Sequence, residues 1–278
     1  MKKIILITGA SSGMGESAAR QLLEKGHQVY GAARRMDHMK DLEEAGATIL
    51  PLDLTRDESI VSCIEEIVKR EGRIDVLINN AGYGSYGAVE DVPIEVARRQ
   101  FEVNLFGLAR ITQLVLPEMR KNSSGRIVNI SSMGGKMYTP LGAWYHATKH
   151  ALEGWSDCLR LELKESGIDV VIVEPGVIKT PWVDVSVQNL LETSGNGAYS
   201  RMANKVAQNL TELYSSNSAT DADVLGRVIA RAATVDNPKT RYVKGHLARM
   251  AMTARKWLGD RIYDRLMIYQ MGGDSPIF

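Results

Sequence analysis

Cysteine is scarce in this chain of 278 residues, which contains only Cys63 and Cys158. The two stand far apart and in no pattern with histidine that is typical of a zinc site or of a disulfide framework. A chain that does without disulfides is typical of a reducing compartment. We therefore expect a cytoplasmic protein that binds no metal.

Long apolar runs are also missing, since no stretch approaches the ~20 consecutive apolar residues of a membrane-spanning helix. The basic start Met1-Lys2-Lys3 and the apolar Ile4-Ile5-Leu6-Ile7 resemble the beginning of an export signal. However, Thr8-Gly9 ends the run before the ~7–15 apolar residues that such a signal needs. We interpret the run as a buried first strand and expect no membrane span.

An excess of either charge is absent as well, because 34 Lys and Arg against 33 Asp and Glu give a formal net charge of +1. This balance disfavours a nucleic-acid partner and, for the chain as a whole, an anionic membrane. The end is locally different, since Leu247–Tyr269 is amphipathic, with Met, Trp, Leu and Ile among arginines. Such a segment can lie on a membrane, but more often it packs on its own domain or on a twin subunit.

What the sequence does contain is a regular alternation of short apolar runs and amphipathic stretches. The runs predicted as strands are Lys3–Thr8, Gln28–Ala33, Thr48–Leu52, Val76–Asn79, Arg126–Ile130, Asp169–Glu174 and a short last strand Thr240–Lys244. The stretches predicted as helices are Met14–Lys25, Met36–Ala45, Glu58–Glu71, Ile94–Lys121, Ala143–Ser166 and Ala222–Thr234. Nearly continuous apolar strands suit a parallel sheet that is covered on both faces. The order predicts an α/β fold with a Rossmann-like doubly wound parallel sheet and helices on both faces.

The pattern loosens after Pro175, and Val185–Asn204 is polar and irregular, with a Ser-Gly-Asn-Gly turn. No linker, internal repeat or low-complexity tract divides the chain. We therefore expect a single domain over residues 1–278. Residues 1–181 would form the cofactor-binding and catalytic core, and residues 182–278 a substrate loop and a C-terminal helical extension of the same domain.

Glycine is concentrated where the first strand turns into the first helix, in the segment Thr8-Gly-Ala-Ser-Ser-Gly-Met-Gly15. Glycines let a pyrophosphate approach the backbone, and a helix N-terminus offers N–H groups and the positive end of a dipole. A plain glycine turn is the alternative. The position after an apolar strand and before a helix favours a dinucleotide site.

The end of the second strand bears on which dinucleotide binds. An acidic residue there hydrogen-bonds the ribose 2′-hydroxyl of NAD, but this chain has Ala33 followed by Arg34-Arg35. Arginine suits a 2′-phosphate, so we expect NADP to be preferred, with NAD possible. The alternative is two solvated arginines at a helix start. Asp53-Leu54, after the third strand, can flank the adenine, and Asp53 can also cap the following turn.

One tyrosine of the ten is followed by lysine at the fourth position, namely Tyr145, with Lys149 one helical turn away. Carbonyl reduction needs a hydride on carbon, which a nicotinamide supplies, and a proton on oxygen. A free phenol has a pKa near ~10, and a nearby ammonium lowers it. We expect Lys149 to lower the pKa of Tyr145 in this way.

Taken together, these motifs resemble the short-chain dehydrogenase/reductase family over roughly the first two thirds of the chain. The matching segments, in order, are Thr8–Gly15, Asn79-Asn80-Ala81-Gly82, Asn104 in Phe-Glu-Val-Asn-Leu-Phe-Gly, Ile130-Ser131-Ser132, Tyr145 with Lys149, and Pro175-Gly176 with Thr180. One departure is Tyr145-His146-Ala147-Thr148-Lys149, where the family often has Tyr-x-Ala-Ser-Lys. His146 and His150 are an i, i+4 pair, but no third metal ligand is evident. The tail beyond Pro181 matches no substrate type.

The resemblance implies residue roles. The implied catalytic residues are Asn104, Ser132, Tyr145 and Lys149. The implied cofactor-binding residues are Gly9, Ser11, Ser12, Gly13, Met14, Gly15, Arg34, Asp53, Leu54, Asn80, Ala81, Gly82, Tyr145, Lys149, Pro175, Gly176, Val177 and Thr180. Ser132, rather than Ser131, would donate to the substrate oxygen, and Lys149 would also hold the nicotinamide ribose. Asn104 would hold a water, unless it is a buried asparagine satisfied by protein groups.

The resulting prediction is an NADP(H)-dependent oxidoreductase that acts on a small-molecule carbonyl or alcohol, with Tyr145 as the acid/base. The alternatives are an alcohol dehydrogenase for a steroid- or retinol-like substrate and a non-catalytic NADP-binding sensor. An apolar mouth would favour a bulky apolar carbonyl; its candidate residues are Tyr83, Tyr86, Met133, Met137, Tyr138, Trp144, Trp182 and Val183. The resemblance also implies a homodimer or homotetramer that pairs the helices Ile94–Lys121 and Ala143–Ser166.

Overall fold

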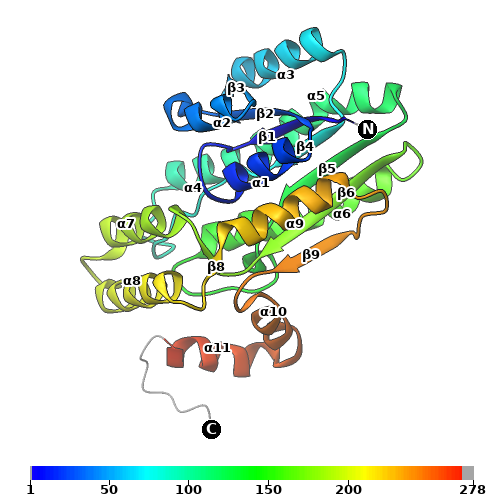
Figure 1. The fold of residues 1–278 in the computed structure, drawn as a ribbon. Coiled ribbons are helices and arrows are strands. Elements are labelled where there is room, and N and C mark those ends of the chain that lie inside the picture. The colour runs from blue at the N-terminus through cyan, green and yellow to red at the C-terminus, as the bar shows by residue number, and fades with distance from the viewer. Residues whose placement is uncertain (1, 271–278) are drawn as a thin grey trace.

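The computed structural model describes residues 2–270, and its centre is a seven-stranded parallel sheet in the order β3-β2-β1-β4-β5-β6-β9 (Figure 1). The strands are β1 Ile4–Thr8, β2 Gln28–Ala33, β3 Thr48–Pro51, β4 Val76–Asn79, β5 Gly125–Ile130, β6 Ile168–Pro175 and β9 Arg241–Lys244. The order runs outward in both directions from the β1–β4 pair, which is the doubly wound arrangement. The predicted parallel sheet is therefore confirmed.

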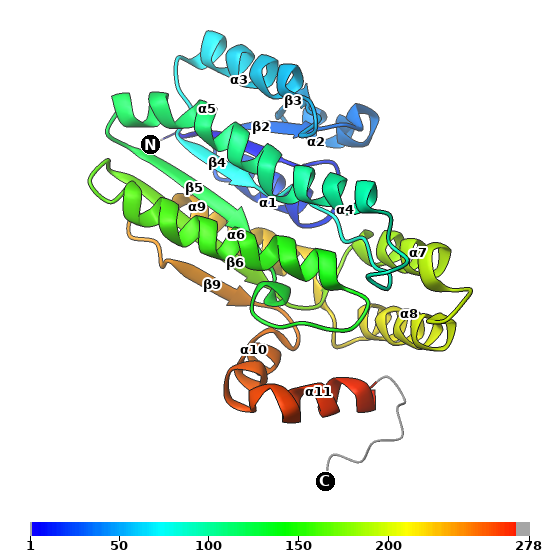
Figure 2. The ribbon, with the colours of Figure 1, turned by 180° about the vertical axis from the view of Figure 1, so that it is seen from behind.

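Helices cover both faces of this sheet. On one face lie α1 (Gly13–Glu24), α2 (Lys40–Glu44) and α9 (Ala222–Thr234), and on the other α3 (Asp57–Glu71), α5 (Gly107–Lys121) and α6 (Ala143–Glu162) (Figures 1 and 2). Alternate residues of β1 enter the two cores, Ile5 and Ile7 on the α1 side and Leu6 on the α3 side. Burial on both faces explains why the strands are apolar without alternation. Before α2, the predicted helix Met36–Ala45 starts with a 3₁₀ turn, Met36–Met39.

The predicted helix Ile94–Lys121 is not continuous. It divides into α4 (Ile94–Phe101), a π-helical turn η2 (Glu102–Phe106) and α5. A Cβ added to Gly107 would overlap the carbonyl oxygen of Leu54, so the start of α5 lies directly against the loop after β3. A π turn accommodates one extra residue, and such turns occur often at functional sites.

The segment expected to be irregular, Val185–Asn204, is helical instead. It is covered by α7 (Trp182–Ser194) and α8 (Ser200–Ser215), and the predicted glycine turn is confined to the link between them. The buried face of α7 carries Ser186, Leu190 and Ser194, two of which are serines. Their hydroxyls are satisfied by Gly84 and Trp182 carbonyls and by Asp91, so polar side chains occupy a buried stripe. The expectation of an irregular segment was wrong because serines occupy buried positions of α7, so its apolar residues do not show helical periodicity.

The last part of the chain forms two short strands and two terminal helices. β7 (Ile178–Lys179) pairs with β8 (Thr220–Asp221) outside the main sheet. The amphipathic segment Leu247–Tyr269 forms α10 (Ala248–Trp257) and α11 (Gly259–Gln270), which meet at Gly259 in the left-handed region, with φ +68°. Tyr263 and Met267 pack on Met137, so one face of this segment covers its own domain.

Across residues 2–270, the structure contains no helix with the length and apolarity required for a membrane span.

Candidate functional site

The glycine segment makes a tight turn between β1 and α1. Gly9 and Gly13 adopt φ +69° and +60°, where a side chain is strained. A Cβ on Gly9 would lie 2.8 Å from Cα of Ala81, and one on Gly15 would overlap the Asn80 amide. Glycine is therefore required by backbone conformation and by close approach to the chain after β4.

Asn80 fastens this turn to β4. Its Nδ2 donates to the carbonyl oxygens of Thr8 and Gly9, both at 3.0 Å. The Thr8 hydroxyl accepts from the backbone N–H groups of Asn80 and Ala81 at 3.1 Å. The predicted Asn79-Asn80-Ala81-Gly82 segment thus holds the turn in shape.

The first turn of α1 offers a site for an anion. Ser12 is its N-cap, in extended conformation, and within residues 2–270 its side chain makes no capping hydrogen bond. Ser11, Ser12 and Met14 are half-buried, and a methyl group of Thr180 would lie 3.0 Å from a Cβ on Gly13. N–H groups of a first helical turn point outward and favour negative charge. This arrangement fits the pyrophosphate of a dinucleotide.

Two arginines gather at the end expected to hold the adenosine. Arg34 is exposed just beyond β2. Burial raises the pKa of Asp53, but hydrogen bonds from Thr55 and the positive charges of Arg34 and Arg99 outweigh it and lower that pKa. Asp53 thus caps its own turn, as the alternative interpretation held. Arg99 comes from α4 and was not predicted, because nothing in the sequence connects α4 with β2.

Tyr145 is buried among aromatic rings from three other segments, and 8% of it is exposed. Its ring centroid lies 5.9 Å from that of Tyr86 and 5.3 Å from that of Trp182. Trp182 in turn stacks on Tyr214, at 5.7 Å. Helices α7 and α8 therefore cover the phenol with apolar surface.

The expected effect of Lys149 on Tyr145 is contradicted. Burial raises the pKa of Tyr145 to about 12, and the hydrogen bond with the Ser132 side chain lowers it only in part. Burial also lowers the pKa of Lys149 to about 8, against the negative charge of Glu153. The Lys149 Nζ donates to the carbonyl oxygen of Ile130 at 2.8 Å. Desolvation is therefore the largest cause of both pKa shifts.

Asn104 lies in the π turn beside Lys149. A Cβ on Gly82 would be 3.2 Å from Asn104 Oδ1 and 3.7 Å from Lys149 Nζ. The Asn104 amide is satisfied by the backbone of Tyr83 and by the Thr148 hydroxyl. This is the structural role that the sequence left open as the alternative to holding a water.

The two serines after β5 differ as expected. Ser132 is half-buried, and its hydroxyl accepts from the N–H of Gly134 at 3.0 Å. Ser131 is buried toward Glu153, where a Cβ on Gly135 would touch both residues. Among the described residues, its hydroxyl has no hydrogen-bond partner. Ser132 is therefore the serine beside Tyr145.

His146 shapes the loop that carries Ser132, a role that was not predicted. Its Nε2 accepts from the backbone N–H of Thr139 at 3.1 Å, and its Nδ1 lies 2.9 Å from the Gly134 carbonyl oxygen. Burial lowers the pKa of His146 to about 4, so the ring is neutral at ordinary pH. Nowhere in residues 2–270 do three His, Cys, Asp or Glu side chains form a metal-binding group.

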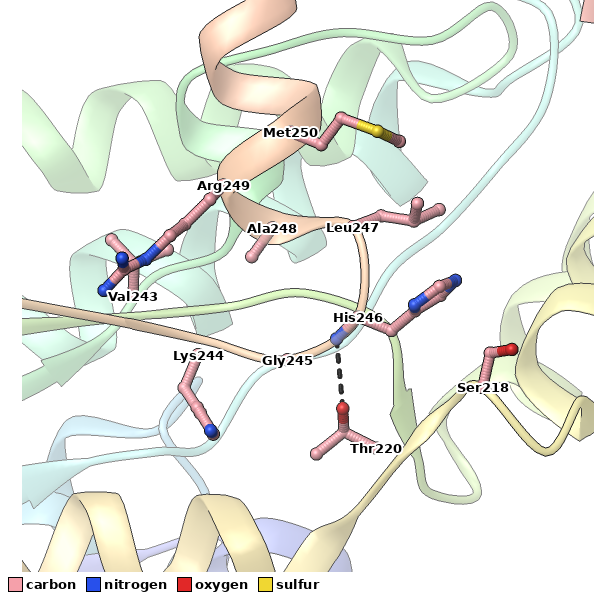
Figure 3. Close-up of a pocket in the computed structure, with 10 residues that line it drawn as sticks. All are labelled: Ser218, Thr220, Val243, Lys244, Gly245, His246, Leu247, Ala248, Arg249 and Met250. Carbon is pink, nitrogen blue, oxygen red and sulfur yellow. Dashed lines mark hydrogen bonds between the residues drawn. The ribbon is translucent and has the colours of Figure 1, made fainter.

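The segment after β6 joins the nucleotide turn to the C-terminal part. Pro175 ends β6, and the N–H of Val177 donates to the His246 carbonyl oxygen at 2.9 Å. A hollow of about 740 Å³ opens behind this contact, at the end of β9 (Figure 3). It is lined by Ser218, Thr220, Val243, Lys244, Gly245, His246, Leu247, Ala248, Arg249 and Met250. None of the predicted site residues lines it, and the side chains of Lys244, His246 and Arg249 point in different directions (Figure 3).

Four of the residues expected at an apolar mouth separate into two pairs. Tyr86 and Trp182 surround Tyr145, as expected of a substrate pocket. Met137 and Tyr138 instead pack against Tyr263 and Met267 of α11. Met137 and Tyr138 thus lie against the C-terminal helices rather than beside Tyr145.

Known proteins place this architecture in a family. The family model for short chain dehydrogenase matches residues 3–190. The chain is 37% identical to 3-ketodihydrosphingosine reductase of Bacteroides thetaiotaomicron, over 94% of each chain. It is 32% identical to NADPH-dependent 3-dehydrocapnine reductase of Ornithobacterium rhinotracheale, again over 94% of each. The solved structure of a short-chain dehydrogenase from Streptomyces avermitilis superposes with a TM-score of 0.80 at 33% identity, over 98% of each chain.

The chain therefore belongs to the short-chain dehydrogenase/reductase family. Within that class, it is an enzyme that acts on CH–OH and C=O groups with a nicotinamide dinucleotide.

Proposed function

We propose that this enzyme is an NADP(H)-dependent carbonyl reductase in which Tyr145 is the proton donor. The observation that carries the proposal is the common location of Ser132, Tyr145 and Lys149 beside the glycine turn, with Gly82 next to Lys149. When bound, the dinucleotide supplies the hydride. The glycine turn and the N-terminus of α1 would hold its pyrophosphate. Lys149 and the segment Pro175-Gly176-Val177 with Thr180 would hold its nicotinamide end.

The Tyr145 phenol is protonated at neutral pH, as carbonyl reduction requires. A phenol with a pKa of about 12 stays protonated at neutral pH, which is the form that donates a proton to a carbonyl oxygen. The Ser132 hydroxyl would donate a hydrogen bond to the same oxygen as negative charge develops on it. The opposite direction, oxidation of a steroid- or retinol-like alcohol, uses the same residues and remains the second candidate. A non-catalytic NADP sensor would not need Ser132 and Tyr145 together.

The substrate we propose is a ketone on an apolar molecule. The rings of Tyr86, Trp182 and Tyr214 and the apolar side chains of α7 and α8 enclose the phenol. Two relatives bear the names of reductases for 3-ketodihydrosphingosine and 3-dehydrocapnine. Those names and the apolar enclosure agree on the chemical class.

The test is NADPH oxidation against a panel of ketones, with Tyr145→Phe beside the wild type. We expect the variant to bind NADPH with unchanged affinity and to lose turnover by about 10²–10⁴-fold, because the proton donor is missing. Tyr138→Phe, which removes a hydroxyl that bonds Asp264, is the matched control and should keep its turnover. Equal turnover of Tyr145→Phe and wild type would exclude Tyr145 as the acid.

Cofactor choice is a second part of the proposal. Arg34 and Arg99 would pair with the 2′-phosphate of NADP, and one relative is named as NADPH-dependent. Arg34→Ala should raise the Kd for NADPH about 10-fold or more and leave that for NADH nearly unchanged. Arg35→Ala serves as the control. Equal weakening of both dinucleotides would exclude the phosphate contact.

We propose a homodimer or homotetramer in the cytoplasm, with residues 1–181 as the catalytic core and residues 182–278 as part of the same domain. Exposed apolar side chains on the two helical segments expected to pair, Ile94, Val96, Phe106 and Leu161, support the assembly. A single monomer mass in light scattering would contradict it.

A further inference from the structure

The two terminal helices form an outlying layer of the molecule. Helices α10 and α11 lie below the sheet on the side of α8, and little of the domain covers their outer surface (Figures 1 and 2). Six of the large exposed apolar side chains belong to this short stretch: Met250, Trp257, Leu258, Ile262, Ile268 and Tyr269. Trp257 is 75% and Met250 65% exposed, far beyond what a helix packed on its domain needs.

The two sides of α11 differ in their contacts: the inner side packs on the domain and the outer side is exposed. Its inner side buries Tyr263 and Met267, and the Tyr263 hydroxyl donates to the Tyr138 carbonyl oxygen at 3.0 Å. Ile262 and Tyr269 are seven positions apart, so they share the outer side, and Arg265 lies between them. The outer side is therefore apolar and basic, while the inner side already has its contacts.

The two acidic side chains of this segment are exposed, but both already have partners. Asp264 accepts from the Tyr138 hydroxyl at 2.8 Å, and Asp260 pairs with Arg255 at 2.7 Å. Arg255 itself lies over the rings of Tyr138 and Tyr263. Four exposed cations have no ion-pair partner among residues 2–270: Arg261 and Arg265 on α11, and Arg249 and Lys256 on α10, which line hollows beside the domain. The surface of α10 and α11 is locally basic, although the whole chain is almost neutral.

We propose that the outer surface of α10 and α11 docks on an anionic lipid bilayer. Exposed Trp, Ile, Leu and Met side chains among Lys and Arg are the composition that enters the headgroup region of such a surface. The cations are attracted by the negative surface potential of anionic lipids. A second copy of the chain fits this surface less well, since a two-fold contact would bring two locally basic surfaces together. A nucleic acid would pair with the cations but leave the apolar side chains uncovered.

Docking here would bring the bilayer close to the proposed active site. Helix α11 packs on Met137 and Tyr138, in the loop that runs from Ser132 to the start of α6. A ketone on an apolar molecule dissolves in lipid rather than in water. This last step rests on the proposed function, whereas the docking itself does not.

The experiment is sedimentation of the full chain with vesicles of phosphatidylcholine, or of phosphatidylcholine mixed with phosphatidylglycerol. We expect binding to the mixed vesicles, weaker binding as salt is raised, and little binding to phosphatidylcholine alone. Arg261→Glu with Arg265→Glu should lower the partition coefficient at least 10-fold, and Trp257→Ala with Ile262→Ser should lower it comparably. Lys25→Glu with Lys69→Glu, which reverses two exposed cations elsewhere, should leave it unchanged.

Two controls keep the result specific. The thermal midpoint and the NADPH affinity of each variant should equal those of the wild type, since all substituted side chains are exposed. Failure to sediment with mixed vesicles, or equal sedimentation with both kinds, would overturn the proposal. So would a dimer in light scattering that Trp257→Ala with Ile262→Ser dissociates, because the surface would then join two copies. None of these readouts depends on turnover, so they are independent of Tyr145.

Discussion

Helix α6 buries ionisable groups in two different ways along its length. Near its start, Tyr145 and Lys149 are buried with few polar partners. Burial raises the pKa of Tyr145 and lowers that of Lys149, so it favours the neutral form of both. One turn beyond Lys149, Glu153 is equally buried but forms two ion pairs. Its Oε2 lies 3.0 Å from Lys136 Nζ and 2.9 Å from Arg241 Nη2. One helix thus carries a reactive end and a paired end.

The paired end is itself not uniform. Arg241 joins Glu153, Asp157 and Glu174, which come from α6 and β6. Its Nε is 3.3 Å from Glu174 Oε1, near enough for attraction but not aligned for a hydrogen bond. Burial and the charge of Glu153 therefore raise the pKa of Glu174 to about 7. The comparison teaches that proximity to a cation does not ensure ionisation, since hydrogen-bond geometry and shared partners decide it.

Lys149→Met removes the ammonium group at the reactive end of α6 and should have the largest effect. We expect turnover to fall by about 10²–10⁴-fold, because the variant cannot hold the nicotinamide end of the dinucleotide beside Tyr145. The folded-state pKa of Lys149 is about 8, below 10.5, so the wild type should gain stability as the pH rises between these values. The variant should lack that gain, which is on the order of 1–3 kcal/mol. Urea unfolding at pH 7 and pH 10 measures it, and a persistent gain in Lys149→Met would assign it to another group.

Glu174→Gln tests the paired end of α6, where the stability of the wild type should change with pH in the opposite direction. Its folded-state pKa is raised from 4.5 to about 7, so the wild type should lose stability as the pH rises between these values. The variant stays neutral and should exceed the wild type in stability at pH 8 by roughly 1–3 kcal/mol.

Asp157→Asn is the matched control for that measurement. Burial raises the pKa of Asp157, but hydrogen bonds from Arg241 and Arg160 outweigh it, so the pKa is lowered. This carboxylate stabilises the fold at neutral pH and loses that contribution as the pH falls, so Asp157→Asn should be destabilised at pH 8. If both variants were destabilised there, Glu174 would be ionised in the folded protein.

His146→Gln tests the loop that precedes helix α6 and should have the smallest effect. The Thr139 N–H donates to His146 Nε2, so its hydrogen exchange should accelerate several-fold in the variant. The KM for a ketone should rise modestly while the folded protein stays stable. His150→Gln, one turn away and exposed, should change neither quantity. Unchanged exchange at Thr139 in His146→Gln would show that the loop does not depend on the imidazole.

The sequence predicted the sheet well because its strands are buried on both faces, which makes runs such as Ile4–Thr8 apolar without interruption. The glycine turn was equally visible, because Gly9 and Gly13 need backbone angles that few other residues adopt. Helix α7 was missed because Ser186 and Ser194 are buried through hydrogen bonds that no periodicity reveals.

The electrostatics of the site could not be predicted from spacing alone. Tyr145 and Lys149 were correctly placed on one helix, but their pKa shifts depend on burial by α7, α8 and the loop after β5. Arg99 and Arg241 gain their partners from segments far away in the chain. Such contacts arise only when the chain is folded, so a motif supplies candidate residues without their ionisation states.

The π turn at Glu102–Phe106 has a consequence for how this enzyme tolerates insertions and deletions. Removal of one residue from that turn would restore a regular helix but rotate all of α5 by about 100° relative to α4. Thr112 would then leave Asn79, and Ile111, Val115 and Met119 would leave the core beneath them. The extra residue thus sets the rotation of α5 relative to α4. A change of length in the π turn should destabilise the fold far more than a point substitution on either side of it.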